Sequence, residues 1–239
     1  MKYLLIGRGR MGTLIQQTAQ AAGDEIAAAF DRSNLDQLAR LGKIADVVID
    51  FSHPEALAET ASYVRRTGTP LLSGTTGFTA GQMEQIRSLG TAAPVLWAAN
   101  YSLGIAVFVR ALEAVSDVLK PDFDIELTET HHNQKADAPS GTAKLLLNAV
   151  DPRHERTPVY GREGGCGKRA KNEIGVHALR GGTVAGTHTV HFFGPEEELE
   201  ITHRAASRQI FVNGALRMAR LLPGKPKGVY DLQKILFGE

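Results

Sequence analysis

Short apolar runs alternate with amphipathic stretches through the first hundred residues of the chain. Runs of this kind are typical of strands buried on both faces of a parallel sheet, and they are residues 2–6, 25–30, 46–51, 70–73 and 94–98. Helical patterns fill the intervals, one ending near Gly23, one running from Pro54 to about Thr67 and one from Gln82 to Leu89. This alternation predicts an α/β fold with a doubly wound parallel sheet.

The second half of the chain has a different pattern. A long apolar helix is expected over Ser102–Leu119, and a strand with one buried face over Phe123–Thr128. The further elements expected are a helix at 143–149, a loop at 158–172, strands at 174–180, 183–193 and 198–204, a helix at 208–222 and a closing segment at 229–236. These predict a mixed or antiparallel sheet. His188 and His191 fall on opposite faces of the middle strand, so at least one of them is expected to be structural.

The first apolar run leads directly into Gly7-Arg8-Gly9-Arg10-Met11-Gly12. G-x-G-x-x-G between a strand and a helix indicates a dinucleotide-binding turn, because the glycines allow a tight turn, the approach of a pyrophosphate and close helix packing. Asp31 ends the second run, where an acid accepts hydrogen bonds from the adenosine ribose. Arg32 beside it, and the arginines of the turn, suit the extra phosphate of NADPH. NADH and NADPH therefore both stay open.

Ligands of doubly wound sheets bind beyond the carboxyl ends of the strands. Besides the glycine turn and Asp31, the residues expected at that edge are Phe51, Gly74, Thr75, Thr76, Ala98, Ala99, Asn100 and Tyr101.

A polar segment from Glu126 to Ala143 carries the candidate chemistry. His131 and His132 can move a proton near neutral pH, and Lys135 can supply a cation or, with a depressed pKa, an acid. Ser140, Gly141 and Thr142 stand at the start of a helix, where free N–H groups and the helix dipole favour a carboxylate. Singly, each of these features is common on protein surfaces; together, within one segment, they indicate a site.

Composition narrows the class of protein. With 27 basic and 26 acidic side chains, nothing indicates nucleic-acid binding, and the basic cluster Lys168, Arg169 and Lys171 is expected to be solvated surface. No apolar run approaches the length of about 18 residues that spans a membrane, so a cytoplasmic protein is expected. The lone Cys166 excludes an internal disulfide. No metal is expected, because the adjacent histidines point apart and no HExxH motif or Cys/His quartet is present.

The pattern E-x-x-E-x-H-H-x-x-K-x-D-A-P-S-G-T-A over residues 126–143 closely resembles the signature of the 4-hydroxy-tetrahydrodipicolinate (dihydrodipicolinate) reductase family of lysine biosynthesis. The resemblance covers nearly the whole chain. Its further motifs are Asp-Phe-Ser at 50–52, Gly-Thr-Thr-Gly at 74–77, Ala-Ala-Asn-Tyr-Ser at 98–102, Gly-Arg-Glu-Gly at 161–164 and Asn-Gly-Ala at 213–215. It implies a Rossmann-like dinucleotide-binding domain of residues 1–102 and 208–239. Residues 103–207 would form an α+β domain, with a mixed sheet, for substrate binding and homotetramer assembly.

The resemblance also implies roles by position. His131 would be a proton donor and acceptor, Lys135 a proton donor, and His132, Lys135, Ser140, Gly141 and Thr142 would bind a cyclic dicarboxylate. The glycine turn, Asp31 with Arg32, and residues 74–76 and 98–101 would hold NADH or NADPH. The expected reaction is hydride transfer to C4 of the conjugated imine that remains when the substrate's hydroxyl leaves as water.

Two alternatives stay open. A related NAD-dependent enzyme acting on another imino or amino acid would keep the fold and change the pocket. A non-catalytic NADH-sensing protein would be expected to lack His131 or Lys135, and the chain has both.

Overall fold

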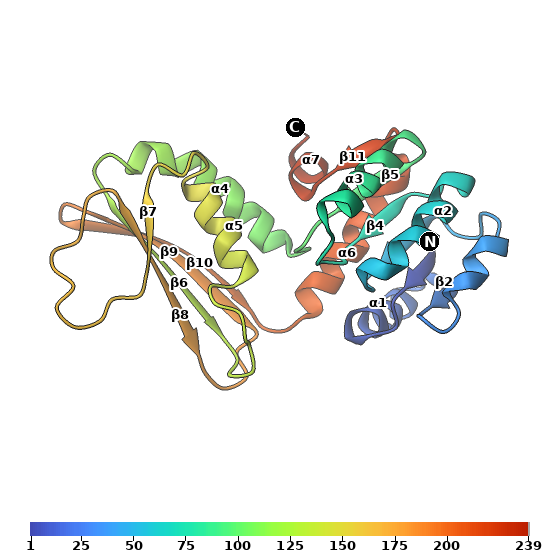
Figure 1. Ribbon diagram of the computed structural model, residues 1–239, viewed down its shortest axis with the longest axis horizontal. Coiled ribbons are helices and arrows are strands. Elements are labelled where there is room, and N and C mark those ends of the chain that lie inside the picture. The colour runs from blue at the N-terminus through green and yellow to red at the C-terminus, as the bar shows by residue number, and fades with distance from the viewer. Residues whose placement is uncertain (239) are drawn as a thin grey trace. The chain divides into compact units, whose positions relative to one another are not determined.

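The computed structural model describes residues 1–238, and the chain divides into two compact units (Figure 1). The first unit contains residues 1–102 together with the chain from Gln209 onward, and the second contains Leu103–Arg208. The chain therefore leaves the first unit after Ser102 and returns to it at Gln209.

The first unit is built on a parallel sheet of six strands. They are β1 (Lys2–Ile6), β2 (Glu25–Phe30), β3 (Val47–Asp50), β4 (Leu71–Ser73), β5 (Pro94–Trp97) and β11 (Gly228–Tyr230). Their spatial order is β11-β5-β4-β3-β1-β2, so the order reverses between β1 and β3. A ligand crevice is expected at that reversal. The predicted doubly wound sheet is confirmed, with one strand more than the sequence pattern indicated.

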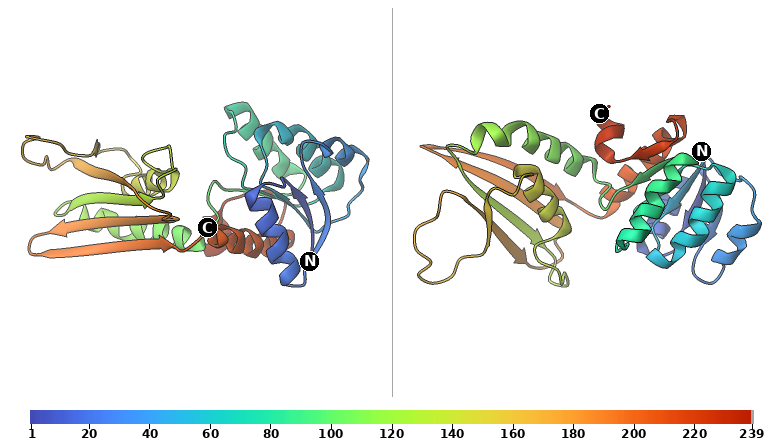
Figure 2. Two further views of the ribbon diagram at one scale, coloured as in Figure 1. Left: turned by 90° about the horizontal axis from the view of Figure 1, so that it is seen from below. Right: turned by 45° about the horizontal axis from the view of Figure 1, so that its top comes forward.

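Helices cover both faces of this sheet (Figure 2). The strand order explains this, because the connections from β1 to β2 and from β3 to β5 run in opposite directions along the sheet, and such connections are generally right-handed. The helices are α1 (Arg10–Ala21), α2 (Leu57–Thr67), α3 (Ala80–Ser88), α6 (Gln209–Leu221) and α7 (Leu232–Phe237). Short 3₁₀ turns complete the unit at η1 (Leu35–Arg40), η2 (Pro54–Ala56), η3 (Leu89–Thr91) and η4 (Leu222–Gly224). The central strands are buried on both faces, and Leu4, Val48, Leu72 and Val95 are fully inaccessible.

The second unit has a mixed five-stranded sheet in the order β10-β9-β6-β8-β7. Its elements are α4 (Leu103–Leu119), β6 (Asp124–His131), α5 (Gly141–Val150), β7 (Thr157–Tyr160), β8 (Glu173–Arg180), β9 (Gly186–Gly194) and β10 (Glu197–Ala205). Strand β6 is antiparallel to β9 and parallel to β8, which confirms the mixed sheet. Helices α4 and α5 pack on one face (Figure 1), and β6 turns Ile125, Leu127, Glu129 and His131 toward that face.

Two sequence-based expectations for this unit are wrong. Residues 157–160, expected to be loop from Pro158 onward, form β7, which tolerates a proline because it is an edge strand. Arg169, expected to be solvated, is only 19% exposed and donates to Asp124 and Glu126. The loop between β7 and β8 folds back across β6, and that return brings Arg169 to these acids.

Candidate active site

A loop of eight residues joins the last residue of β6, His131, to the residue that caps α5, Ser140. The Ser140 hydroxyl accepts a hydrogen bond from the Ala143 N–H at 3.0 Å, so Ser140 caps the helix as its residue type predicts. At the other end, the chain after β8 holds the loop, because the Gly181 N–H donates to the His131 carbonyl at 2.9 Å. Every candidate substrate or proton-transfer residue lies between His131 at the end of β6 and Thr142 in the first turn of α5.

Glu129 lies beneath the loop and is fully buried. Its carboxylate accepts hydrogen bonds from His131 Nδ1 at 2.5 Å and from the Ser140 N–H at 3.0 Å, and it forms a two-bond pair with Arg180 at 2.8 and 2.9 Å. Burial alone would raise the pKa of Glu129, but the donors from Arg180, His131 and Ser140 together hold that pKa below its ordinary value. Glu129 is therefore a charged carboxylate that orients His131.

Lys135 points its ammonium at the Asp137 carboxylate, with Nζ and Oδ1 2.7 Å apart. Its side chain is 19% exposed, and the hydrogen bond that it donates lowers the pKa of Asp137. The Lys135 N–H donates to the His132 carbonyl at 3.1 Å, which closes a tight turn. These two contacts hold Lys135 in place within the loop.

His188 reaches the same site from β9. Its Nε2 lies 2.9 Å from the Ser140 hydroxyl, and its ring centroid lies 5.1 Å from that of His131. Burial, reinforced by the neighbouring His131, lowers the pKa of His188 to about 4, so this ring is neutral near neutral pH. His191 lies on the other face of the sheet, where its Nδ1 contacts Glu198 at 2.9 Å.

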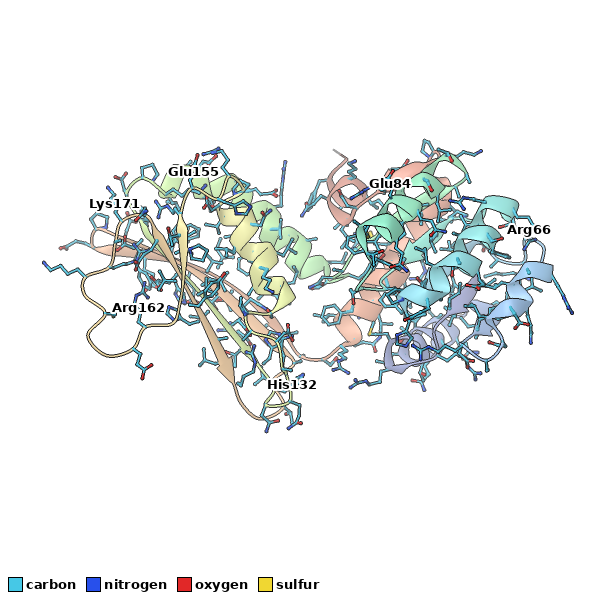
Figure 3. The ribbon with its side chains drawn as sticks, viewed as in Figure 1. Arg66, Glu84, His132, Glu155, Arg162 and Lys171 are labelled. Atoms are coloured by element: carbon cyan, nitrogen blue, oxygen red, sulfur yellow. The ribbon has the colours of Figure 1, made fainter. Side chains whose placement is uncertain are left out.

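The remaining predicted substrate residues surround the helix start. His132 is half-buried on the loop beyond the end of β6 (Figure 3), and Gly141 and Thr142 form the first turn of α5. A Cβ atom at Gly141 would meet no atom within 4 Å, so the space beside this turn is open. The start of such a helix is a favourable place for an anion.

In the first unit, the glycine turn between β1 and α1 is closely packed. Gly7 has a φ of 99°, and a Cβ atom there would overlap the Phe51 carbonyl. A Cβ atom at Gly12 would overlap the Gly7 carbonyl, and one at Gly74 would overlap the Phe51 ring. Gly9 caps α1 without a side chain, so the N-terminal turn containing Arg10 and Met11 is left accessible. This arrangement fits a bound pyrophosphate.

A cleft of about 400 Å³ opens beside this turn, and Gly7, Arg8, Gly12 and Asp31 are among the residues that line it. Hydrogen bonds from the side chain and backbone of Ser33, and then the charge of Arg8, lower the pKa of Asp31. Arg8 lies 3.6 Å from Asp31, and Arg32 lies 3.9 Å from Glu55. Of the three arginines that were expected to suit a second phosphate, Arg8, Arg10 and Arg32, two therefore already face an acid.

The other predicted cofactor residues lie at the ends of β3, β4 and β5. Thr76 and Ala99 are exposed there, Ala98 and Asn100 are half-buried, and Thr75 is buried with its hydroxyl accepting from the Ser52 N–H. Tyr101 is also buried, and it donates its hydroxyl hydrogen bond to the Ser73 carbonyl at 2.8 Å. Its side chain supports the crevice from beneath.

Sequence reasoning gave no role to Glu129 or Arg180 and little weight to His188. The motif contains Glu129, and the alternation of β6 would have placed it on the buried face with His131. Arg180 carried no comparable signal, because its position depends on how β8 aligns with β6. Among residues 1–238, His191, Glu198 and Glu200 form a cluster of metal-ligating residue types, and it lies on the face opposite the His131 site.

The comparisons with known proteins cover both units. The family models described as dihydrodipicolinate reductase, N-terminus and C-terminus, match residues 1–101 and 104–236. The 4-hydroxy-tetrahydrodipicolinate reductase of Exiguobacterium sibiricum is 39% identical, covering 98% of this chain and 96% of its own. That of Pseudomonas fluorescens is 38% identical, covering 95% of each.

Among solved structures, a dipicolinate-bound dihydrodipicolinate reductase from Paenisporosarcina sp. TG-14 has the same fold, with a TM-score of 0.81 and 21% identity over 99% of both chains. Within residues 1–238, every helix is too short or too polar to cross a membrane. The two family models and the full-length relatives agree with the signature over residues 126–143, and the chain belongs to the dihydrodipicolinate reductase family.

Proposed function

We propose that the protein reduces (2S,4S)-4-hydroxy-2,3,4,5-tetrahydrodipicolinate to tetrahydrodipicolinate with loss of water, in lysine biosynthesis through diaminopimelate. The observation that carries the proposal is one loop that brings together a carboxylate-oriented histidine, a lysine and an open helix start. His131 is held by Glu129 at 2.5 Å, and Ser140 caps α5 beside them. This combination offers proton transfer next to an anion site, as a cyclic dicarboxylate requires.

The substrate's carboxylates are assigned to the helix start and the cations of the loop. The N–H groups of Gly141 and Thr142, in the open first turn of α5, would bind one carboxylate, and His132 and Lys135 would bind the other. Lys135 is already paired with Asp137, so a substrate carboxylate would share or replace that partner. Fixing both carboxylates orients the ring for reaction.

When bound, the reduced nicotinamide supplies a hydride to C4 of the conjugated imine that is left after the hydroxyl departs as water. Lys135 donates the proton that the neighbouring carbon takes up, so that hydride and proton together saturate one carbon–carbon bond. His131 has its Nδ1 committed to Glu129, which leaves Nε2 to polarise the substrate or pass a proton. Gly186 keeps room for this edge of the ring, since a Cβ atom there would lie 3.1 Å from Nε2.

The cofactor is a pyridine nucleotide, and we assign its preference to NADH. The Asp31 carboxylate at the end of β2 suits the ribose hydroxyls and repels a phosphate at the same place. Arg8 and Arg32, two of the three arginines considered for a second phosphate, lie within 4 Å of Asp31 and Glu55 respectively. A phosphate on the ribose would have to break these pairs.

The second unit also suits assembly into the tetramer that the resemblance implies. Leu179 and Phe193 are 52% and 41% exposed on the sheet face that α4 and α5 leave open. Burying them against other copies would remove apolar surface from water. Light scattering at micromolar concentration measures the assembly, and monomers alone would exclude it.

The test of the activity follows the oxidation of NADH and NADPH, with the unstable substrate generated in place by dihydrodipicolinate synthase. The wild type should oxidise NADH faster than NADPH, and Lys135→Ala should lower kcat by roughly 10² to 10⁴, the usual contribution of a general acid. Undiminished kcat in Lys135→Ala would remove the lysine from this role. A wild type that binds NADH but oxidises neither cofactor would exclude the reductase activity.

A further inference from the structure

Arg180, the last residue of β8, contacts both the buried glutamate and the loop of the candidate active site. Its Nη1 and Nη2 donate to the two carboxylate oxygens of Glu129 at 2.9 and 2.8 Å. Nη2 also donates to the backbone carbonyl of Asp137 at 2.7 Å. One planar guanidinium therefore holds two partners with fixed relative directions, which a lysine ammonium cannot reproduce.

These contacts join the parts of the loop that would do the chemistry. Glu129 holds the beginning of the loop through His131 Nδ1 and its end through the Ser140 N–H. Asp137, whose carbonyl Arg180 holds, carries the carboxylate that pairs with Lys135. Arg180 is thus linked to His131 through one residue and to Lys135 through another.

The charge of Arg180 also keeps Glu129 ionised. The groups that face Glu129 are His131 on β6, Arg180 on β8 and the Ser140 N–H, while His188 on β9 and Lys135 and Asp137 in the loop stand farther out. His188 is neutral and Lys135 is paired with Asp137, so Arg180 is the permanent cation in contact with the carboxylate. Removing it would leave a fully buried carboxylate with His131 as its remaining ionisable partner.

We propose that Arg180 is a positioning residue for the reductase reaction, setting the orientation of His131 and the place of Lys135 through Glu129 and the Asp137 carbonyl. This role rests on the proposed function. It extends the site beyond the loop to a strand that the signature over residues 126–143 does not include. A displacement of about 1 Å in such a constellation costs roughly 10²-fold in rate.

If Arg180 had a structural role alone, its loss should affect the enzyme no more than the loss of a similar ion pair elsewhere. The chain contains such a pair as a matched control. Arg162 forms the same two-bond pair with Glu126, at 2.9 and 2.9 Å, on the opposite face of β6. Figure 3 shows Arg162 beside the strands and away from the loop that carries His132. Loss of a two-bond arginine–glutamate pair is common to both substitutions, whereas loss of the site's geometry is particular to Arg180.

The experiment compares Arg180→Ala, Arg180→Lys and Arg162→Ala in the NADH assay, with and without added guanidinium ion. Arg180→Ala should lose about 10²-fold in kcat with the KM for NADH unchanged, and guanidinium should restore a measurable part of the rate, because the Arg180 side chain is 21% exposed. Arg180→Lys keeps the positive charge but cannot donate two parallel hydrogen bonds to Glu129, so its kcat should exceed that of Arg180→Ala by less than tenfold. Arg162→Ala should stay within about twofold of wild type and gain nothing from guanidinium.

Two further measurements separate a positioning role from loss of structure. The acid limb of kcat/KM should move to higher pH in Arg180→Ala, because removing the cation raises the pKa of Glu129, and a protonated Glu129 no longer holds His131 as a charged acceptor. The NMR signal of the His131 Nδ1–H should move away from its strongly hydrogen-bonded position without any substrate present. Folding is checked on Arg180→Lys if the alanine variant is insoluble.

The outcomes are distinguishable. An inactive wild type whose His131 signal changes in Arg180→Ala would overturn the proposed function and leave the positioning contact standing. An active wild type with Arg180→Ala within threefold of its kcat would overturn the role of Arg180. Equal losses in Arg180→Ala and Arg162→Ala, without guanidinium rescue, would reduce Arg180 to a structural ion pair.

Discussion

Strand β6 carries two shielded glutamates that face opposite sides of its sheet, and the contrast between them separates support from function. Glu126 accepts from Arg162, from Arg169 at 3.1 Å and from His177 at 2.8 Å. Glu129 accepts from Arg180, His131 and the Ser140 N–H. Each carboxylate thus has a forked arginine pair and a histidine, so residue types alone do not distinguish them.

The two clusters differ in the further contacts that the partners of each glutamate make. Arg162 continues to Glu173 at 2.6 Å and Arg169 to Asp124 at 2.7 Å, so the Glu126 cluster closes on itself and fastens the loop between β7 and β8. The Glu129 cluster opens toward an accessible helix start and a lysine. A saturated set of ion pairs stabilises the fold, whereas a set with a side chain still free to meet a ligand can do chemistry.

The largest effect expected from this contrast is on turnover. Glu129→Gln replaces an oxygen by an N–H₂ group facing donors from Arg180, His131 and Ser140, so at least one hydrogen bond becomes a clash of donors. We expect kcat to fall by roughly 10²-fold through misorientation of His131. Glu126→Gln is the matched control, with kcat within about twofold of wild type. Similar losses in both variants would abolish the distinction between the two faces.

Sequence reasoning predicted the elements that local patterns determine. The strands of the first unit follow from their apolar runs, and the Ser140 cap follows from its residue type. The glycine turn follows from the G-x-G-x-x-G spacing, and the structure explains that spacing because a Cβ atom at position 7 or 12 would overlap the backbone. Strands β7 and β11 were missed because they are short edge strands, and because β11 pairs with β5, which lies far from it in sequence.

The Glu129–Arg180 pair shows why part of the site could not be predicted. The two residues are 51 positions apart, and they meet because β6 and β8 align in parallel with His131 opposite Arg180. A shift of one residue in that register would turn Arg180 to the other face of the sheet. The register between β6 and β8 follows from the packing of the whole sheet, so it cannot be predicted from a local motif.

A smaller effect is expected on stability, and it should belong to Glu126. Burial raises its pKa, but donors from Arg162, His177 and Arg169 outweigh burial and lower the pKa of Glu126 to about 2. A depressed pKa stabilises the fold above the ordinary pKa of about 4.5, and that contribution is lost as the pH falls toward 2. Glu126→Gln should therefore lower the free energy of unfolding by about 2 to 3 kcal/mol at pH 7.

Urea unfolding of wild type and Glu126→Gln at several pH values measures this contribution. The two unfolding free energies should converge between about pH 4.5 and pH 2, where the wild-type carboxylate takes up its proton. A difference that stays constant over this range would show that the substitution acts through packing. The electrostatic part of the Glu126 cluster would then be negligible.

The smallest effect should come from the histidine of the closed cluster. His177→Gln keeps a donor within reach of Glu126, which retains both of its arginines, so the free energy of unfolding should fall by less than about 1 kcal/mol and kcat should not change. His131→Gln, the matched change at Glu129, should lose most of the activity because the glutamine side chain cannot replace the imidazole in proton transfer. Thermal unfolding and NADH turnover of both variants provide the comparison. A fivefold or larger drop in kcat for His177→Gln, with thermal unfolding unchanged, would mean that the Glu126 face affects the reaction centre.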